Sequence, residues 1–436
     1  MDMRISPGRL SGSIRAVSSK SDMHRALICA AFSDRKTSIS CNVLSKDIEA
    51  TARCLKAMGA EISHNGDVGE FTVYPIKIRA DKKADPEDSK GIAEAKAEPR
   101  RTQEETVELD CGESGSTLRF ILPVAAAIGG VFHVTGEGKL PERPLGPLIT
   151  ELSRHGISFS SDKLPLYMEG KLSGNDFEIA GNISSQFITG LLLAFPLTET
   201  KTETRAELRL TTKLESEAYV DISLSVMRSF GVYAEKGKSS FRLNTTGEGY
   251  ISPGRYIVDG DWSNGAMWLC ADFAEGNNIE VTGLRNDSPQ GDRQVSDILK
   301  RMKNEELLTI DVSGIPDLVP ALAAAAAFKT GCVRFVNAGR LRIKECDRLS
   351  AIAENLKRLS VRTEETEDSL TVWGRTYLEG GVRLSGFNDH RMVMSAAIMG
   401  AACRSPIIIE GAEAVSKSYP GFFEDFRKLG GKADVI

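Results

Sequence analysis

The chain has 436 residues, of which 41% are hydrophobic and 6% aromatic, and its formal net charge at pH 7 is −5. This length is too great for one hydrophobic core, so we expect a soluble globular protein of two domains. The negative charge argues against a broad nucleic-acid-binding surface. The lack of any apolar run of about 18 residues argues against a membrane-spanning helix.

A pattern of alternating helices and strands recurs about six times along the chain. Each copy starts with a small polar cluster and an Ala-rich helix, followed by a strand, a second helix and a short pair of strands. The first helices are expected within 18–32, 112–130, 184–195, 261–273, 315–328 and 387–402. The second helices are expected to begin near 47, 145, 218, 295, 349 and 421.

The second helices stop in similar ways, at KAMGA, SRHGI, RSFGV, KRLSV and RKLGG. Glycine in the fourth place supplies a left-handed C-cap. The alternation of helix and strand predicts an α/β fold with helices packed on sheets. Three copies in each domain would give two similar lobes.

The seam between the lobes is predicted near Pro253 to Asp261. One lobe would span 19–257, and the other would combine 1–18 with 258–436, because the strand-like N-terminus is expected to pair with the second lobe. Residues 79–108 are charged, poor in apolar side chains and without periodicity. We interpret them as an exposed excursion between two strands.

The stretch RLRIKECDRL, residues 340–349, follows a strand-like segment and precedes a helical one. A solvated helix face is the simpler interpretation of such a charged run. A strand-to-helix junction, however, offers backbone N–H groups and a helix dipole to anions. There Lys344 and Arg348 could hold a phosphate and a carboxylate, and Glu345 could transfer a proton.

The polar starts of the first helices form a second set of candidates. Each cluster alone is typical of helix capping, but repeated units aim equivalent helix ends in the same direction. Several N-termini could then face one cleft and favour a polyanion. The candidates at these starts are Lys20, Ser21, Arg25, Gly112, Ser114, Gly115, Ser116, Arg119, Ser184, Ser185, Gln186, Asp317, Asn388, Asp389, His390 and Arg391.

Arg143 and Lys417 are further basic candidates, because they stand in proline-containing loops whose backbone is restrained. For His390, a hydrogen bond to neighbouring backbone is the alternative to a role in a site. No phosphate-binding glycine motif of the nucleotide-binding folds occurs. The eight cysteines show no zinc spacing and the N-terminus has no signal-peptide core, so no metal is expected and the location predicted is cytoplasmic.

Nine motifs together resemble the EPSP synthase family, the 3-phosphoshikimate 1-carboxyvinyltransferases. They occur in the family's order and are KSDMHRAL, GESGSTLRF, ERPLGPL, SSQFITGLLLA, DGDWSNGA, IPDLVPALA, IKECDRL, NDHRMVMS and VSKSYPGFFED. The resemblance implies the enolpyruvyl transferase fold, an inside-out α/β barrel of two lobes with three βαβαββ units each. It also implies a transferase that moves the enolpyruvyl group of phosphoenolpyruvate to the 5-hydroxyl of 3-phosphoshikimate, in the shikimate pathway to chorismate and the aromatic amino acids.

The resemblance also implies roles for single residues. Asp317 would accept the hydroxyl proton, Glu345 would deliver a proton to the methylene carbon, and Lys20 would touch both substrates. The implied 3-phosphoshikimate-binding residues are Lys20, Ser21, Arg25, Ser184, Ser185, Gln186, Ser216, Tyr219, Asp317 and Lys344. The implied phosphoenolpyruvate-binding residues are Lys20, Gly115, Arg143, Gln186, Arg348, Arg391 and Lys417. No cofactor, metal, nucleic acid or membrane is implied as a partner, and we expect a monomer.

The chemistry agrees with this assignment but leaves one balance open. Phosphoenolpyruvate carries a phosphate and a carboxylate close together, which calls for several cations. Nearby Lys and Arg lower the pKa of a carboxyl group, whereas burial raises it. Whether Glu345 can act as an acid therefore depends on which of these two effects is larger. Glu113 stands where many relatives have Asn, which puts a direct contact with phosphoenolpyruvate in doubt. Gly115 leaves room for glyphosate, a competitor at that subsite, so we expect sensitivity.

Two other interpretations are open. A sister family with the same fold uses UDP-N-acetylglucosamine as acceptor and usually has a Cys in the loop equivalent to 136–143. Here that loop reads GEGKLPER and has none. A repeat scaffold without chemistry is the other alternative, although scaffolds rarely place acidic and basic residues at equivalent helix starts.

Overall fold

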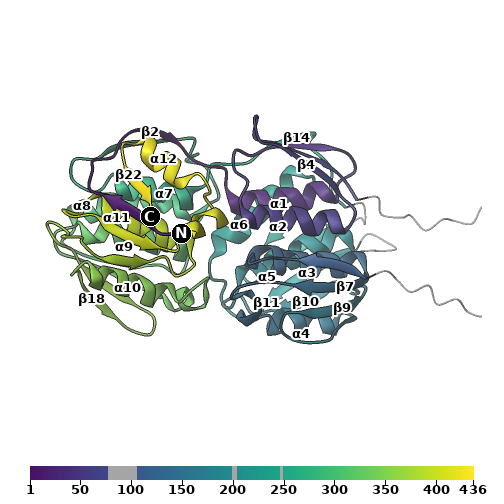
Figure 1. Ribbon diagram of the computed structural model, residues 1–436. Coiled ribbons are helices and arrows are strands. Elements are labelled where there is room, and N and C mark those ends of the chain that lie inside the picture. The colour runs from purple at the N-terminus through teal and green to yellow at the C-terminus, as the bar shows by residue number, and fades with distance from the viewer. Residues whose placement is uncertain (77–105, 199–203, 246–248) are drawn as a thin grey trace, which may run out of the picture.

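The computed structural model describes residues 1–76, 106–198, 204–245 and 249–436. The chain forms two lobes side by side, and both termini lie in the lobe that holds the C-terminal half (Figure 1). The described strands form five four-stranded sheets and one two-stranded sheet, with helices packed against them. This is the two-lobed α/β architecture that the sequence predicts.

Two units of the first lobe are built from continuous stretches of chain, and their sheets have the same strand order, β6-β7-β9-β8 and β10-β11-β13-β12. The earlier unit consists of β6 (Val107–Asp110), α3 (Gly115–Ile128), β7 (Gly130–Thr135), α4 (Gly146–Arg154), β8 (Ile157–Phe159) and β9 (Leu166–Gly170). The later unit consists of β10 (Asp176–Ile179), α5 (Ser185–Ala194), β11 (Thr204–Leu210), α6 (Glu217–Ser229), β12 (Ala234–Lys236) and β13 (Ser240–Thr245). In both sheets the first pair is parallel and the later pairs are antiparallel.

The sheet of the first unit includes a strand that is distant in the sequence. It contains α1 (Lys20–Ala31), β3 (Thr37–Ser40), α2 (Lys46–Ala57), β4 (Glu61–Asn65) and β5 (Glu70–Tyr74). Its outer strand is β14 (Arg255–Ile257), which runs parallel to β3.

The N-terminal strands complete two units of the second lobe. β1 (Met3–Ser6) lies between β21 (Ile407–Glu410) and β22 (Lys432–Val435), and β2 (Ser11–Arg15) pairs with β15 (Asn278–Thr282). Ser18 and Gly260 form a β-bridge where the chain passes from one lobe to the other. The other second-lobe elements are α7 (Trp262–Ala271), α8 (Val295–Asn304), β16 (Leu307–Asp311), α9 (Val319–Ala327), β17 (Cys332–Val336), α10 (Arg348–Arg358), β18 (Arg362–Glu365), β19 (Leu370–Trp373), β20 (Arg383–Ser385), α11 (His390–Ala401) and α12 (Phe422–Lys428).

The helix ends follow local sequence rules. Five first helices have side-chain N-caps, which are Ser19, Ser114, Ser184, Asp261 and Asp389. The predicted glycine stops all have positive φ, at Gly59, Gly156, Gly231 and Gly430. Ser360 takes the same left-handed conformation, with φ of 60°, where the fifth copy has no glycine.

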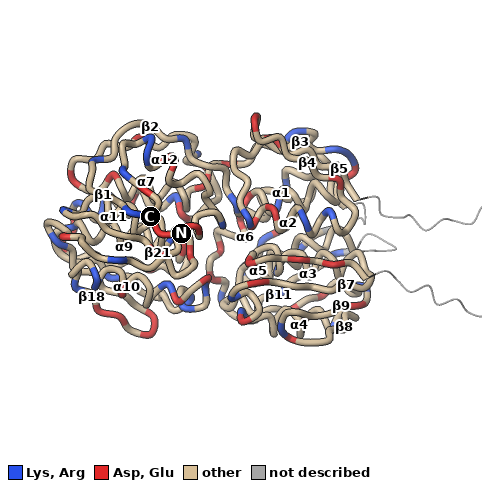
Figure 2. Tube along the Cα trace, in the orientation of Figure 1, with Lys and Arg blue, Asp and Glu red and all other residues tan. Residues whose placement is uncertain are grey.

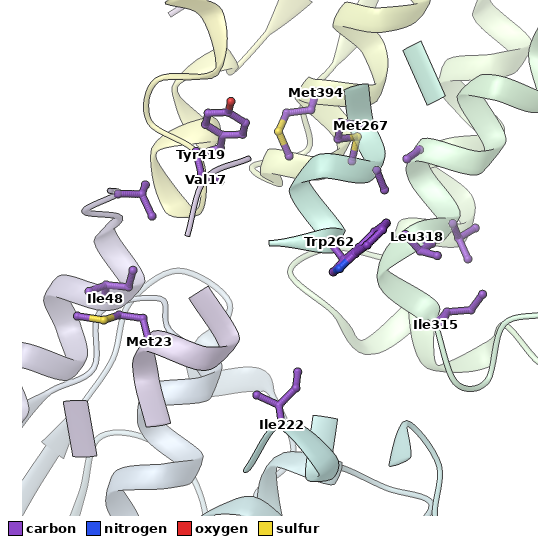
Figure 3. Close-up of a cluster of buried hydrophobic side chains, with 14 of the residues drawn as sticks. Val17, Met23, Ile48, Ile222, Trp262, Met267, Ile315, Leu318, Met394 and Tyr419 are labelled. Atoms are coloured by element: carbon purple, nitrogen blue, oxygen red, sulfur yellow. The ribbon is translucent and has the colours of Figure 1, made fainter. Parts of the chain in front are cut away.

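The first helices are central and the second helices lie outside them. Every residue of α9 is buried, whereas α8 buries only a stripe of three of its residues. The small side chains of VPALAAAAA let neighbouring helices approach closely, and burial of this apolar surface stabilises the fold. Figure 3 shows a cluster of such buried side chains, with Met23 from α1, Trp262 from α7 and Met394 from α11.

Most of the predicted excursion, residues 79–105, lies outside the described residues. Its C-terminal boundary was wrong, because Val107 and Glu108 belong to β6 and pair with Phe132 and His133. The alternating sequence VELD presents Leu109 to the core, so it joins the sheet despite its charges. No helix in the described ranges has both the length and the apolar character needed to cross a membrane.

Candidate active site

A cavity between the two lobes collects almost all of the predicted site residues. The space within it, counted together with the solvent at its open mouth, is about 1110 Å³. Figure 2 shows acidic and basic positions on both sides of this seam. The predicted residues that line it are Lys20, Ser21, Arg25, Gly115, Arg143, Ser184, Ser185, Gln186, Ser216, Tyr219, Asp317, Lys344, Glu345, Arg348 and Arg391. Lys417 does not line the cavity, although its neighbour Ser418 does.

Seven of the described helices begin at the cavity wall: the first helices α1, α3, α5, α7 and α11, and the second helices α6 and α10. Their first residues or N-caps line it, from Lys20 on α1 to His390 on α11. Free backbone N–H groups and the positive ends of the helix dipoles therefore surround the cavity and favour an anion. This convergence follows from the repeat, which places equivalent helix ends on the same side of each unit.

Arg348 is the centre of the charged network on the second-lobe side. Its side chain is only 1% exposed, and each of its three nitrogens donates to a different carboxylate. Nε lies 2.7 Å from Asp389 Oδ2, Nη1 lies 2.7 Å from Asp317 Oδ1, and Nη2 lies 2.7 Å from Glu345 Oε2. The guanidinium fork thus fixes the two predicted catalytic carboxylates relative to each other.

The surroundings of both carboxyl groups favour their ionised forms. Burial raises the pKa of Asp317, but Lys344, Arg391 and Arg348 outweigh it and hold the pKa well below its ordinary value. Burial also raises the pKa of Glu345, but Arg348 and other nearby cations hold it well below its ordinary value. The balance that the sequence left open is therefore decided by the cations. The pKa of Lys344 is lowered, mainly by burial.

Several buried nitrogens at the cavity have no hydrogen-bond partner among the described residues. They are Nε of Arg119, Nε of Arg143, Nε of Arg391 and both ring nitrogens of His390. Buried polar groups are normally satisfied, so an orphaned cluster points to a ligand. Burial lowers the pKa of His390 well below its ordinary value, which keeps the ring neutral. The alternative of a backbone hydrogen bond for His390 is not observed.

The first-lobe side carries a second polar network. Arg25 Nε donates to Ser223 Oγ at 2.7 Å and Nη2 donates to the Tyr219 carbonyl at 2.9 Å, so the guanidinium is held in place. Arg119 Nη1 donates to Gln186 Oε1 at 3.0 Å. Ser184 and Ser185, at the N-terminus of α5, also line the cavity on this side, and Ser184 Oγ accepts a hydrogen bond from the Gln186 N–H.

Other residues of the cavity were not assigned a role from the sequence. Arg340 donates to Ser216 Oγ at 2.8 Å and links the lobes, and Asp47 pairs with Lys20 at 2.6 Å. Arg340 opens the charged run, which was a usable signal, but nothing in the sequence marks Asp47 as a partner of Lys20. Cys346, in the same charged run, is buried, and burial raises the pKa of its thiol, which disfavours the reactive thiolate.

Comparisons with known proteins agree with the resemblance. The family model described as EPSP synthase (3-phosphoshikimate 1-carboxyvinyltransferase) matches residues 5–426. The chain is 39% identical to 3-phosphoshikimate 1-carboxyvinyltransferase of Clostridioides difficile (strain 630) and 38% identical to that of Clostridium beijerinckii. Each match covers 99% of this chain and 98% of the relative.

Solved structures share the fold. An EPSP synthase from Acinetobacter baumannii matches with a TM-score of 0.77 at 22% identity, with both chains covered completely. The enolpyruvyl transferase NikO from Streptomyces tendae matches with a TM-score of 0.75 at 18% identity, over 99% of this chain and 98% of that one. With the family match over nearly its whole length, the chain belongs to the EPSP synthase (3-phosphoshikimate 1-carboxyvinyltransferase) family.

Proposed function

We propose that this enzyme transfers the enolpyruvyl group of phosphoenolpyruvate to the 5-hydroxyl of 3-phosphoshikimate and releases phosphate. The observation that carries the proposal is the set of guanidinium Nε atoms without a partner among the described residues, which share one cavity with two carboxyl groups whose pKa values are held low. Membership of the family supports the identity of both substrates and the place of the reaction in the shikimate pathway.

Phosphoenolpyruvate is proposed to bind where cations of the two lobes converge. Arg143 contributes from the first lobe and Arg391 from the second, and in the ranges that the structure describes both have a buried Nε without a hydrogen-bond partner. Two anionic groups close together are bound best by several planar guanidinium forks. The proposed set is Lys20, Gly115, Arg143, Gln186, Arg348, Arg391 and Lys417.

3-Phosphoshikimate is proposed to bind on the first-lobe side. Its phosphate would lie at the N-terminus of α5, where Ser184 and Ser185 offer hydroxyl and backbone donors. Tyr219 donates to Asp317 Oδ2 at 2.6 Å, and this contact supports an acceptor pocket beside the proposed base. The proposed set is Lys20, Ser21, Arg25, Ser184, Ser185, Gln186, Ser216, Tyr219, Asp317 and Lys344.

In the proposed reaction the two carboxylates divide the proton transfers. Asp317, already ionised, accepts the proton of the 5-hydroxyl as its oxygen attacks C2 of phosphoenolpyruvate. Glu345 delivers a proton to the methylene carbon, for which it must first become protonated. The negative charges of the substrates offset the positive charges of Arg348 and Arg143 and so raise the pKa of Glu345 in the complex. Glu345 takes its proton from solvent when the substrates bind and recovers it from the new methyl group as phosphate leaves C2, which restores the double bond. The proton held by Asp317 leaves with the phosphate. Lys20 is proposed to contact both substrates during these steps.

We also propose lobe boundaries at 19–257 and at 1–18 plus 258–436. Pairing of β1 and β2 with second-lobe strands, and of β14 with β3, supports them.

We propose a monomer, since one chain supplies both walls of the cavity. Light scattering after size-exclusion chromatography tests this proposal. A cytoplasmic location is proposed because all eight cysteines are unpaired.

Phosphate release from purified protein tests the reaction. We expect release when phosphoenolpyruvate and 3-phosphoshikimate are both present, and none when UDP-N-acetylglucosamine replaces 3-phosphoshikimate. Phosphate release with UDP-N-acetylglucosamine as acceptor, and not with 3-phosphoshikimate, would overturn the assignment of Ser184, Ser185 and Arg25 to the shikimate phosphate.

Glyphosate at millimolar concentration is expected to raise the apparent KM for phosphoenolpyruvate.

Replacement of Gly115 by alanine is expected to weaken phosphoenolpyruvate binding selectively. A Cβ at this position would lie 2.5 Å from Arg143 Nη1 and 2.7 Å from Arg119 Nη1, so both guanidinium groups must move. We expect KM for phosphoenolpyruvate to rise roughly tenfold or more, which corresponds to about 1.4 kcal/mol. KM for 3-phosphoshikimate should stay within about twofold. Gly146→Ala is the control, since nothing lies within 4 Å of its added Cβ.

A further inference from the structure

Glu113 joins the two lobes at the edge of the cavity. It precedes α3 in the first lobe, and its carboxylate reaches two side chains of the second lobe. Oε2 accepts a hydrogen bond from Lys417 Nζ at 2.7 Å and another from Asn388 Nδ2 at 3.1 Å. We call this set of contacts the Glu113 clasp.

The Glu113 clasp uses hydrogen-bond donors of Lys417, the cation that precedes the cavity-lining Ser418. Lys417 is 7% exposed, and its ammonium also donates to the Asn388 carbonyl at 2.8 Å. An ammonium has three N–H donors, so two of the three are already used within the protein. Lys417 thus differs from Arg143 and Arg391, whose buried Nε atoms have no partner in the described part of the chain.

The first lobe provides a seat for the Glu113 side chain. Gly138 has φ of +58°, and a Cβ there would lie 2.5 Å from Glu113 Oε2. Glycine at this position therefore makes room for the carboxylate in the loop that leads to Arg143. The Glu113 side chain is 33% exposed, so it can turn towards water when another anion takes its place.

We propose that Glu113 is a specificity-determining residue, an internal carboxylate that competes with phosphoenolpyruvate for Lys417. This inference rests on the proposed function, in which Lys417 binds that substrate. Binding of the substrate anion to Lys417 must break the Glu113 ion pair or share its charge, and this cost offsets part of the affinity. Glu113 thereby sets the affinity of the phosphoenolpyruvate subsite while contributing nothing to the shikimate subsite.

A charge-only substitution tests the competition. In Glu113→Gln the side chain keeps its shape but loses its charge, so Lys417 becomes available. Calorimetric titration should show phosphoenolpyruvate binding roughly three- to tenfold tighter, with 3-phosphoshikimate binding within about twofold of wild type. Glu137→Gln removes an equal charge from an exposed position in the neighbouring loop and should change neither. In a Lys417→Met background, Glu113→Gln should have no effect, because the two substitutions act through one contact.

Two results would overturn the proposal. Weaker phosphoenolpyruvate binding in Glu113→Gln would mean that the carboxylate orients Lys417 for the substrate. Unchanged binding would mean that the clasp is only a structural link. Because binding is titrated directly, a protein that binds phosphoenolpyruvate but releases no phosphate with 3-phosphoshikimate would refute the proposed function and leave this test intact.

Discussion

Exchange of Glu345 for glutamine is expected to lower kcat by about 10²- to 10⁴-fold, the usual contribution of a positioned acid or base. The amide keeps the size of the side chain but cannot carry a proton to the methylene carbon. Phosphoenolpyruvate should bind at least as tightly as in wild type, because Arg348 and Arg143 then lose a compensating negative charge. Phosphate release and calorimetry measure the two quantities separately.

Asp317→Asn should cause a loss of the same order, since the asparagine cannot accept the proton of the 5-hydroxyl. Glu354→Gln is the matched control, as Glu354 lies on the surface of α10 and its ion pair in the described part of the chain is with Arg358. If kcat of both active-site variants stayed within about tenfold of wild type, the assigned mechanism would be wrong. A loss in Asp317→Asn alone would move the acid role to Lys344, whose ammonium has a lowered pKa.

Replacement of Arg348 by methionine is expected to reduce the free energy of unfolding by about 3–5 kcal/mol at neutral pH, as when one partner of a buried ion pair is removed. Asp317, Glu345 and Asp389 would then be left without their shared counter-ion in a site where Arg348 is 1% exposed. Urea denaturation measures the change. Phosphoenolpyruvate binding should also weaken by about 2–4 kcal/mol because substrate charge loses its partner.

The cost of the Arg348 substitution should depend on pH. In wild type the depressed pKa values of Asp317 and Glu345 mean that these carboxylates stabilise the fold above their unfolded pKa, near 4. That stabilisation is lost as the pH falls through the folded pKa values. The Arg348 variant lacks part of this stabilisation. The difference in free energy of unfolding between wild type and variant should therefore be largest near neutral pH and become smaller below about pH 4.

Arg358→Met is the control for this prediction. Arg358 lies on the same helix, is 45% exposed and pairs with Glu354, so its loss should cost less than about 1 kcal/mol. An Arg348 variant no less stable than this control, or one whose deficit is constant with pH, would contradict the view of Arg348 as the buried counter-ion.

Local sequence determined the elements and much of the candidate site. Polar caps, Ala-rich first helices and the glycine stops act over a few residues, so they predict α1, α3 or α11 without knowledge of the rest of the chain. Because the units repeat, equivalent helix starts were expected to converge, and Lys20, Gly115 and Arg391 were found by that argument. The two-lobed α/β fold followed from the same repeat.

Only the tertiary structure decided how distant segments complete each other. A three-residue strand such as β14 has no signal strong enough to assign it to β3, and Asp47 has no local feature that predicts its pairing with Lys20. The pKa of Glu345 depends on the burial and on the cations that surround it from both lobes. The Glu113 clasp joins residues from opposite lobes. Spacing and propensity act along the chain, whereas charge balance and burial depend on which surfaces face each other after folding.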